Sequence, residues 1–201
     1  MTTAKDLFIT ALDPRPSPPV GQGDLSLALA GAELIDLLAA EAATLDGDRI
    51  VPNVHPAPDD RLLGEASSAL VRQLPYERVE DWLWRRGRDL AAVYQAALEE
   101  AGDLTPRRRG RALFGADHLT PADSDARSRA MSRWTAGEPV LAALAAAVGI
   151  PSEQPTDAPD LDDEAVTTVL AVVNDAVMEL EAVRQRRAIE KAAFANIWRG
   201  P

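Results

Sequence analysis

The chain has 201 residues, 21 of them basic and 32 acidic, and no cysteine, which excludes a disulfide scaffold and any cysteine-ligated metal site. A formal net charge of −11 argues against nucleic acid as the main partner, because phosphate binding needs a basic footprint. Alanine, the best helix former, supplies 37 residues, so the composition predicts a mainly helical protein and excludes an all-β sandwich.

The amino-terminal part is predicted to hold a proline-rich loop followed by an enclosed helix. Residues 14–23 contain four prolines, which prevent regular structure, and they follow a short apolar segment at Leu7–Leu12. Asp24 is expected to cap the next helix, in which Glu33 and Asp36 lie on a thin polar stripe beside a broad apolar face. A central carboxylate costs roughly 2.5–3.5 kcal/mol in a bilayer, so this helix is predicted to be a buried core helix and not a membrane span.

The middle of the chain alternates turn signals with helical patterns. A hairpin is predicted for residues 44–51, because the Asp-Gly pair at their centre supports a turn with positive φ. A helix is expected over about residues 60–74. Residues 77–101 are predicted to form a second helical region that is broken near Gly87, and Gly102 is a typical C-terminal stop.

The second half of the chain begins with another predicted hairpin or extended loop, at residues 104–119. A helix is expected to follow and to run to about residue 134. Thr120 would be its cap and Pro121 would occupy its first helical position. A further helix is predicted over residues 139–148.

The carboxyl-terminal part is predicted to be an acidic linker, residues 151–163, followed by a last helix whose tail is docked by Trp198. Apolar residues of this helix are spaced 4, 3, 4 and 3 apart, which is typical of a packing seam: Val166, Leu170, Val173, Val177 and Leu180. Residues 1–201 are therefore predicted to form a single domain, a mainly α helical bundle with two small β-hairpins. The first residues lack the basic and apolar regions of a signal peptide, so we expect a cytoplasmic protein.

Several short motifs follow one another in a set order along nearly the whole chain. They are Leu29–Leu37, which is similar to an "LRG…LIEL" helix, the hairpin directly after it, Leu62–Ala66, Trp82, Gly102–Thr105, and Leu113–Phe114 leading into His118–Thr120. This ordered set resembles the Golgi phosphoprotein 3 family, whose bacterial relatives are common in high-GC genomes. The resemblance implies a predominantly helical domain. It also implies a peripheral membrane protein that reads phosphatidylinositol 4-phosphate and binds the cytoplasmic tails of membrane enzymes.

The resemblance further implies a headgroup pocket that is built from three arginines and one tryptophan. Arg88 stands at one of the three arginine positions, whereas Ala30 and Ala91 stand at the other two. The loop at residues 14–23 contains no tryptophan. Arg88 is therefore the cation that matches the family's lipid headgroup-binding site.

Arg85 is the second candidate headgroup-binding residue, because a spacing of three residues puts it on the same helical face as Arg88. The alternative is a solvated face on which Arg85 pairs with Asp81 or Asp89. Of the neighbouring tryptophans, Trp82 is predicted to lie in the core. Its neighbour two residues on, Trp84, is predicted to be partly exposed.

A basic and apolar segment in the second predicted hairpin is the candidate membrane-contact site. Its residues are Arg107, Arg108, Arg109, Arg111, Leu113 and Phe114. Cations near an anionic membrane contribute about 1 kcal/mol each, and residues 85–133 carry ten arginines against seven carboxylates. The family's late hairpin is implicated in membrane contact and self-association. With the resemblance, membrane contact and a solvated loop with incidental arginines are equally good interpretations of this segment.

The remaining polar residues give no catalytic or metal-binding pattern. His55 and His118 are isolated, and no nucleophile or phosphate loop accompanies Glu33 and Asp36. We therefore expect neither an enzyme nor a bound metal or cofactor.

Two functions fit these observations. The first is a peripheral adaptor at the inner face of the cell membrane, with an anionic phospholipid or membrane surface and the tails of membrane proteins as partners. The alternative is a soluble protein–protein interaction module that does not bind lipid. Such a module would be a homo-oligomer, a homodimer in the simplest case, joined by the seam of the last helix.

Overall fold

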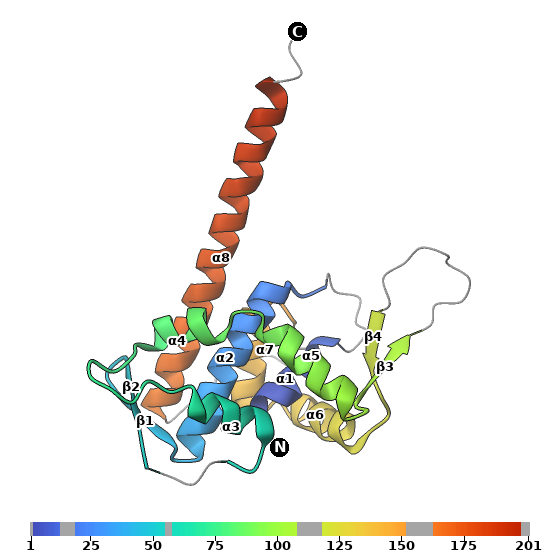
Figure 1. The fold of residues 1–201 in the computed structure, drawn as a ribbon. Helices are drawn as coiled ribbons and strands as arrows, with labels where there is room; N and C mark the ends of the chain where they lie inside the picture. Colours follow the sequence, from blue (N-terminus) through green and yellow to red (C-terminus); the bar gives the residue numbers. More distant parts are fainter. Residues whose placement is uncertain (1, 13–18, 55–57, 108–117, 152–162, 198–201) are drawn as a thin grey trace.

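The computed structural model describes residues 2–12, 19–54, 58–107, 118–151 and 163–197. These residues form a mainly helical fold with two antiparallel hairpins, which confirms the predicted fold class (Figure 1). The helices are α1 (Thr3–Leu12), α2 (Gln22–Ala39), α3 (Arg61–Ser68), α4 (Val79–Arg86), α5 (Leu90–Glu100), α6 (Asp125–Thr135), α7 (Pro139–Ala147) and α8 (Glu164–Ile197). The hairpins pair β1 (Ala43–Asp46) with β2 (Arg49–Pro52) and β3 (Leu104–Arg107) with β4 (His118–Pro121).

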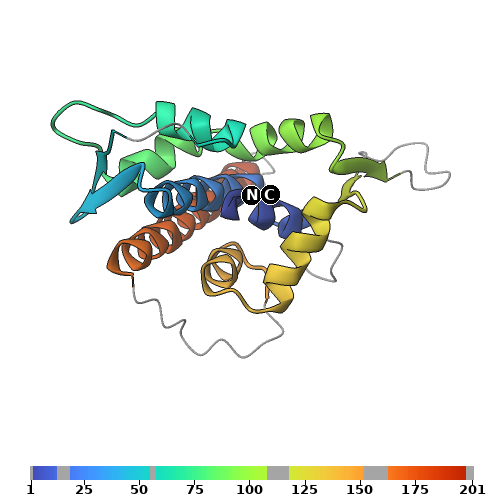
Figure 2. The ribbon, with the colours of Figure 1, turned by 90° about the horizontal axis from the view of Figure 1, so that it is seen from below.

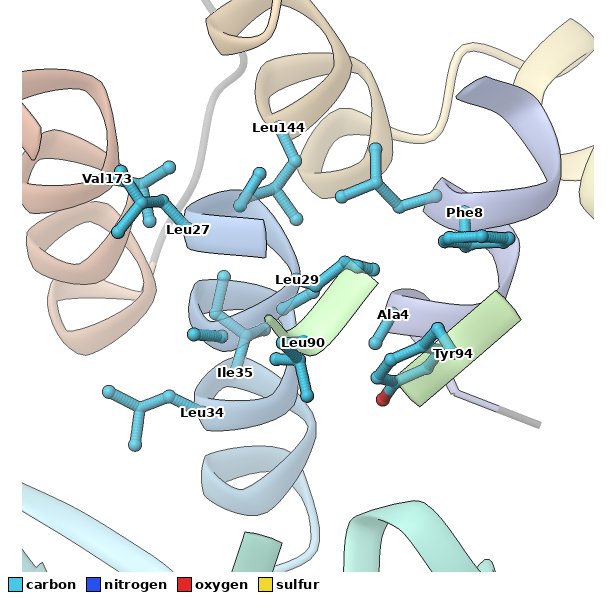
Figure 3. Packing of buried hydrophobic residues seen from close by; sticks show 14 of the residues in the cluster. Ala4, Phe8, Leu27, Leu29, Leu34, Ile35, Leu90, Tyr94, Leu144 and Val173 are labelled. Atoms are coloured by element: carbon cyan, nitrogen blue, oxygen red, sulfur yellow. The ribbon is translucent and has the colours of Figure 1, made fainter. Parts of the chain in front are cut away.

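Helix α2 lies at the centre of the fold, with α1, α4, α5 and α8 packed around it (Figures 1 and 2). Leu29 and Leu34 of α2 are fully buried, and burying each leucine stabilises the fold by roughly 1.5–3 kcal/mol. Phe8 of α1 and Tyr94 of α5 stack beside this helix with their ring centroids 6.3 Å apart (Figure 3). The apolar face of α2 therefore organises the core, as its sequence pattern predicts.

The polar stripe of α2 is enclosed as well and holds α1 in place. The carboxylate of Asp36 accepts hydrogen bonds from the backbone N–H groups of Thr3 (3.1 Å) and Ala4 (3.3 Å). It thus satisfies two of the unpaired donors at the start of α1. On another side, Arg133 of α6 donates to the buried carboxylate of Asp6 at 2.5 Å. Polar contacts from two other helices therefore fix a helix of only ten residues.

Two predicted helix starts are wrong. Helix α2 begins one turn earlier than expected, with Gly21 as its N-cap, so Asp24 lies within the first turn. Thr120 and Pro121 belong to strand β4, where they pair with Thr105 and Leu104 of β3. Helix α6 instead starts after Ser124, whose hydroxyl accepts a hydrogen bond from the backbone N–H of Arg127. Thr120 and Pro121 therefore pair within the β3–β4 hairpin and do not start the helix.

The glycine turn signals in the middle of the chain predict the structure better than the helix starts do. The first hairpin turns at Gly47, which has a φ of +59°, and the long helical region breaks at Gly87 into α4 and α5. Helix α3 is shorter than the predicted helix and ends at Ser68. The hydroxyl of Ser68 donates to the carbonyl of Gly64 at 2.9 Å, a local bond that competes with the helical pattern.

Helix α8 packs against α2, α4 and α7 along its first half. Its buried line consists of Val169, Val173 and Ala176. Of the predicted seam, Val173 lies on this line, and the other members are half-buried and packed against the core. The predicted seam therefore packs against other helices of the same chain. The carboxyl-terminal part of α8 projects away from the other elements (Figure 1).

Gly31 sets the distance between α2 and α8, because a Cβ at this position would collide with the side chain of Val173. Replacing Gly31 with alanine is expected to lower the free energy of unfolding by about 1–3 kcal/mol through overpacking. Urea unfolding followed by circular dichroism measures this change.

Gly64→Ala is the matched control for this substitution. A Cβ at Gly64 of α3 would meet only ordinary contacts, the nearest being the carbonyl of Pro58 at 3.5 Å. Alanine is the better helix former, so the control variant is expected to be as stable as the wild type or more stable. Equal destabilisation by the two substitutions would contradict a specific close approach at Gly31.

Candidate headgroup cleft

Two cavities meet at Trp84 and Arg88, which line both of them. The first has a volume of about 390 Å³ and lies between the start of α2, the α4–α5 turn and α8. Its other lining residues are Gln22, Gly23, Ser26, Leu27, Gly87, Asp89, Ala92 and Leu180. The second, of about 490 Å³, is lined in addition by Glu77, Asp81 and Arg85. We call the first cavity, with Arg88 at its edge, the headgroup cleft.

The α4–α5 turn presents Arg88 because it passes very close to α2. A Cβ at Gly87 would collide with the carbonyl of Leu83 and lie 3.2 Å from that of Ser26, so only glycine fits here. Asp89 then takes a left-handed conformation with a φ of +56°. The backbone N–H of Ala91 donates to the hydroxyl of Ser26 at 3.0 Å. These constraints leave Arg88 and Asp89 as the exposed residues of the turn.

Arg88 and Arg85 both line the second cavity, but their environments differ. The guanidinium of Arg85 donates to both carboxylate oxygens of Glu77, at 2.6 and 2.7 Å. It also lies over the ring of Trp82, 5.3 Å from the centroid, and the hydrogen bond to Glu77 raises its pKa. Arg85 therefore pairs with Glu77 and not with the predicted aspartates. In the part of the chain that the structure describes, Arg88 forms no ion pair.

Arg86 points away from the cleft into a buried polar cluster. Its guanidinium donates to the two carboxylate oxygens of Glu33 at 2.7 and 2.9 Å, and the hydroxyl of Tyr94 donates to the same carboxylate at 3.1 Å. Glu33 is fully buried, and this burial raises its pKa despite the two partners. Burial and the neighbouring Glu33 also hold the pKa of Tyr94 well above its ordinary value. The ion pair joins the last residue of α4 to α2, directly before the α4–α5 turn.

Arg184 of α8, which no sequence pattern had marked as a site residue, lies beside the cleft. Its guanidinium donates to both carboxylate oxygens of Asp24 at 2.7 Å, and this bond raises its pKa. One of its nitrogens lies 2.9 Å from the position that a Cβ on Gly23 would occupy. The pair joins residues 160 positions apart. The signal that could have indicated it is the four-residue step from Leu180, the last residue of the predicted seam.

The candidate membrane-contact hairpin lies largely outside the described residues. Arg107 ends strand β3 opposite His118. The other residues of this site, and also Trp198, are not among the described residues: Arg108, Arg109, Arg111, Leu113 and Phe114.

The two tryptophans of α4, Trp82 and Trp84, lie where the sequence predicts. Trp82 is fully buried and donates to the carbonyl of Ala30 at 3.0 Å, and Trp84 is 37% exposed.

The described residues contain no cluster of three or more histidine or carboxylate side chains suited to a metal ion. Within the same ranges, no helix has the length and apolar character needed to span a bilayer.

A family model described as Golgi phosphoprotein 3 (GPP34) matches residues 4–191. The chain belongs to the Golgi phosphoprotein 3 family. This match confirms the resemblance seen in the ordered motifs, and it extends from α1 into the projecting part of α8. A search of curated proteins finds no match.

Membership of the Golgi phosphoprotein 3 family gives the cleft its context. Ala30 and Ala91, which the resemblance predicts to stand at arginine positions of the family, are both buried here. The carbonyl of Ala30 accepts the hydrogen bond from Trp82, and the N–H of Ala91 is used by Ser26. In this Golgi phosphoprotein 3 family member these two positions serve packing. The cations beside the cleft are Arg88 and, from α8, Arg184.

Proposed function

We propose that this protein is a non-enzymatic peripheral membrane adaptor that binds an anionic phospholipid headgroup in the cleft beside Arg88. The observation that carries the proposal is Arg88, an exposed cation at the edge of a cavity of about 390 Å³, a size typical of ligand sites. Trp84 adds an aromatic face that is 37% exposed. Phosphatidylinositol 4-phosphate is the headgroup that family membership suggests, and the inner face of the cell membrane is the proposed location.

The arginines near the cleft support a single phosphate group as the ligand. Arg85 and Arg86 are held by Glu77 and Glu33, which leaves Arg88 as the cation of the α4–α5 turn that can meet a phosphate. Hydrogen bonds from a cation to an anionic oxygen are about twice as strong as neutral ones. Tails of membrane proteins remain proposed partners of the adaptor at the membrane.

Replacing Arg88 with glutamine is expected to weaken binding to anionic vesicles about 10- to 100-fold, because a charge-assisted hydrogen bond contributes about 1.5–3 kcal/mol. Vesicle flotation with and without phosphatidylinositol 4-phosphate measures the loss. Arg61→Gln is the matched control, since Arg61 is an exposed arginine of α3 that lines neither cavity. Equal binding by the Arg88 and Arg61 variants would contradict the proposal.

The alternative function, a soluble interaction module that forms a homodimer, keeps a different observation in its favour. Its predicted seam packs inside the chain, but Met178, Ile189 and Phe194 of α8 are exposed. A stable dimer in light scattering, together with no binding to anionic vesicles, would select this alternative.

A further inference from the structure

Helix α8 continues well past the point where it leaves the body of the protein (Figure 1). Leu180 is the last residue of the helix that lines the headgroup cleft. From Gln185 onward, each side chain of α8 that the structure describes is exposed. The described side chains of this segment therefore lie in solvent, beyond the part of α8 that lines the cleft.

A line of cations runs up this projecting segment from the cleft. Residues three or four apart lie on the same face of a helix, and Leu180 is followed at steps of 4, 3 and 4 residues by Arg184, Arg187 and Lys191. We call these four residues, Leu180, Arg184, Arg187 and Lys191, the stripe. It starts at the edge of the cleft and continues along the projecting helix. Arg186 is about 100° away from Arg187 around the helix and lies outside the stripe.

The charges available on this stripe are those of Arg187 and Lys191. Arg184 is held by Asp24 at 2.7 Å, whereas neither Arg187 nor Lys191 has an ion-pair partner among the described residues. Residues 181–197 carry four cations against two carboxylates in a chain whose net charge is −11. Surface charges further apart than about 8 Å are largely screened at physiological salt, so the acidic body does not cancel this stripe.

Exposed apolar side chains accompany these cations. Phe194, which is 65% exposed, lies three residues after Lys191 on the same face, whereas Ile189, which is 69% exposed, lies on the opposite face of the helix. A projecting helix that carries cations and large apolar residues is typical of segments that bind at an anionic membrane surface. A second copy of α8 fits less well, because it would place the same cations opposite one another.

We propose that the projecting half of α8 is a second membrane contact, which lays Arg187 and Lys191 on an anionic bilayer while the cleft holds a headgroup. This inference rests on the proposed function and extends it. Leu180 lines the cleft and begins the stripe, so the two sites adjoin along α8. The headgroup in the cleft provides specificity, and the cations of α8 provide general attraction to negative lipids.

The test uses the full chain and two probes: phosphatidylcholine vesicles with or without phosphatidylserine, and soluble inositol 4-phosphate. Each cation near an anionic surface contributes about five-fold in binding. The double variant Arg187→Gln with Lys191→Gln is therefore expected to bind phosphatidylserine vesicles roughly 25-fold more weakly, and added salt should weaken wild-type binding. Binding of inositol 4-phosphate should be unchanged in this variant. Arg186→Gln, matched to Arg187→Gln in charge and position along the helix, should change vesicle binding less than about two-fold.

The Arg88→Gln variant separates this inference from the proposed function. If it loses both inositol 4-phosphate and vesicle binding while the α8 double variant behaves as the wild type, the α8 contact is overturned and the cleft stands. If only the α8 double variant loses vesicle binding, the α8 contact stands and the cleft does not. A wild-type chain that does not bind phosphatidylserine vesicles, or a dimer that the α8 substitutions dissociate, overturns the α8 contact.

Discussion

Replacing Glu33 with leucine is expected to lower the free energy of unfolding by about 3–5 kcal/mol, the usual cost of removing one partner from a buried ion pair. Glu33 is fully buried, and its carboxylate accepts two hydrogen bonds from Arg86 and one from Tyr94. Leucine leaves the guanidinium of Arg86 without its ion-pair partner. The side chain of Arg86 is only 17% exposed, so water replaces this partner poorly. The midpoint of urea unfolding measures the loss.

The double variant Glu33→Leu with Arg86→Leu provides the control. Exchanging a whole buried ion pair for apolar residues is often neutral or stabilising, so the double variant is expected to unfold at higher urea concentration than either single variant. A loss equal to the sum of the two single losses would contradict a direct coupling between Glu33 and Arg86.

Glu33→Gln adds a pH test of the same site. Burial raises the pKa of Glu33 above its usual value of 4.5, so the folded chain binds this proton more tightly than the unfolded chain does. As the pH rises from about 4.5 through the folded-state pKa, the wild type therefore loses stability relative to the glutamine variant, which cannot titrate. Urea unfolding at a series of pH values measures this difference. A difference that grows in favour of the wild type with rising pH would show a lowered pKa instead.

Replacing Trp82 with alanine is the second substitution from which we expect a large effect, a loss of about 3–5 kcal/mol in the free energy of unfolding. Its side chain is fully buried against α2, and its indole N–H donates to the carbonyl of Ala30 at 3.0 Å. Alanine leaves a large cavity and removes the hydrogen bond from the indole to Ala30. It also removes the ring that lies under Arg85. Thermal and urea unfolding measure the change in stability.

Trp84→Ala is the matched control, since it removes the same side chain two positions further along α4. Trp84 is 37% exposed and lines the headgroup cleft. Its loss is expected to cost less than about 1 kcal/mol in stability, because surface positions contribute little, while vesicle binding falls. If the two tryptophan variants lost stability equally, the distinction between a core tryptophan and a cleft tryptophan would be wrong.

The parts of the fold that the sequence predicts best depend on local signals. Gly47 and Gly87 mark real turns, because a positive φ at the first and a close backbone approach at the second require glycine. Trp82 was placed in the core by its spacing from Val79. The start of α6 was misplaced because Thr120 and Pro121 carry a valid capping signal, and strand pairing with β3 overrides that signal.

The pairing of the charged residues could not be predicted in the same way. Arg85 reaches Glu77, eight residues away, and Arg184 reaches Asp24, 160 positions away. Neither distance corresponds to a turn of helix. Both depend on how helices are packed. The cleft is likewise formed by three elements from different parts of the chain. The sequence could therefore name Arg88 as a candidate, but not show that it lines a cavity with Trp84 or that Arg184 lies nearby.

The way in which α1 is held has a consequence for biosynthesis. Its amino-terminal donors are satisfied by Asp36, and the carboxylate of Asp6 is paired with Arg133, 127 positions further along the chain. Helix α1 is synthesised well before α6, so its buried carboxylate has no partner until α6 has been made. A nascent chain that stops before residue 133 therefore exposes an apolar helix that chaperones can bind, and an amino-terminal fusion tag must leave the buried Thr2 and Thr3 free to dock.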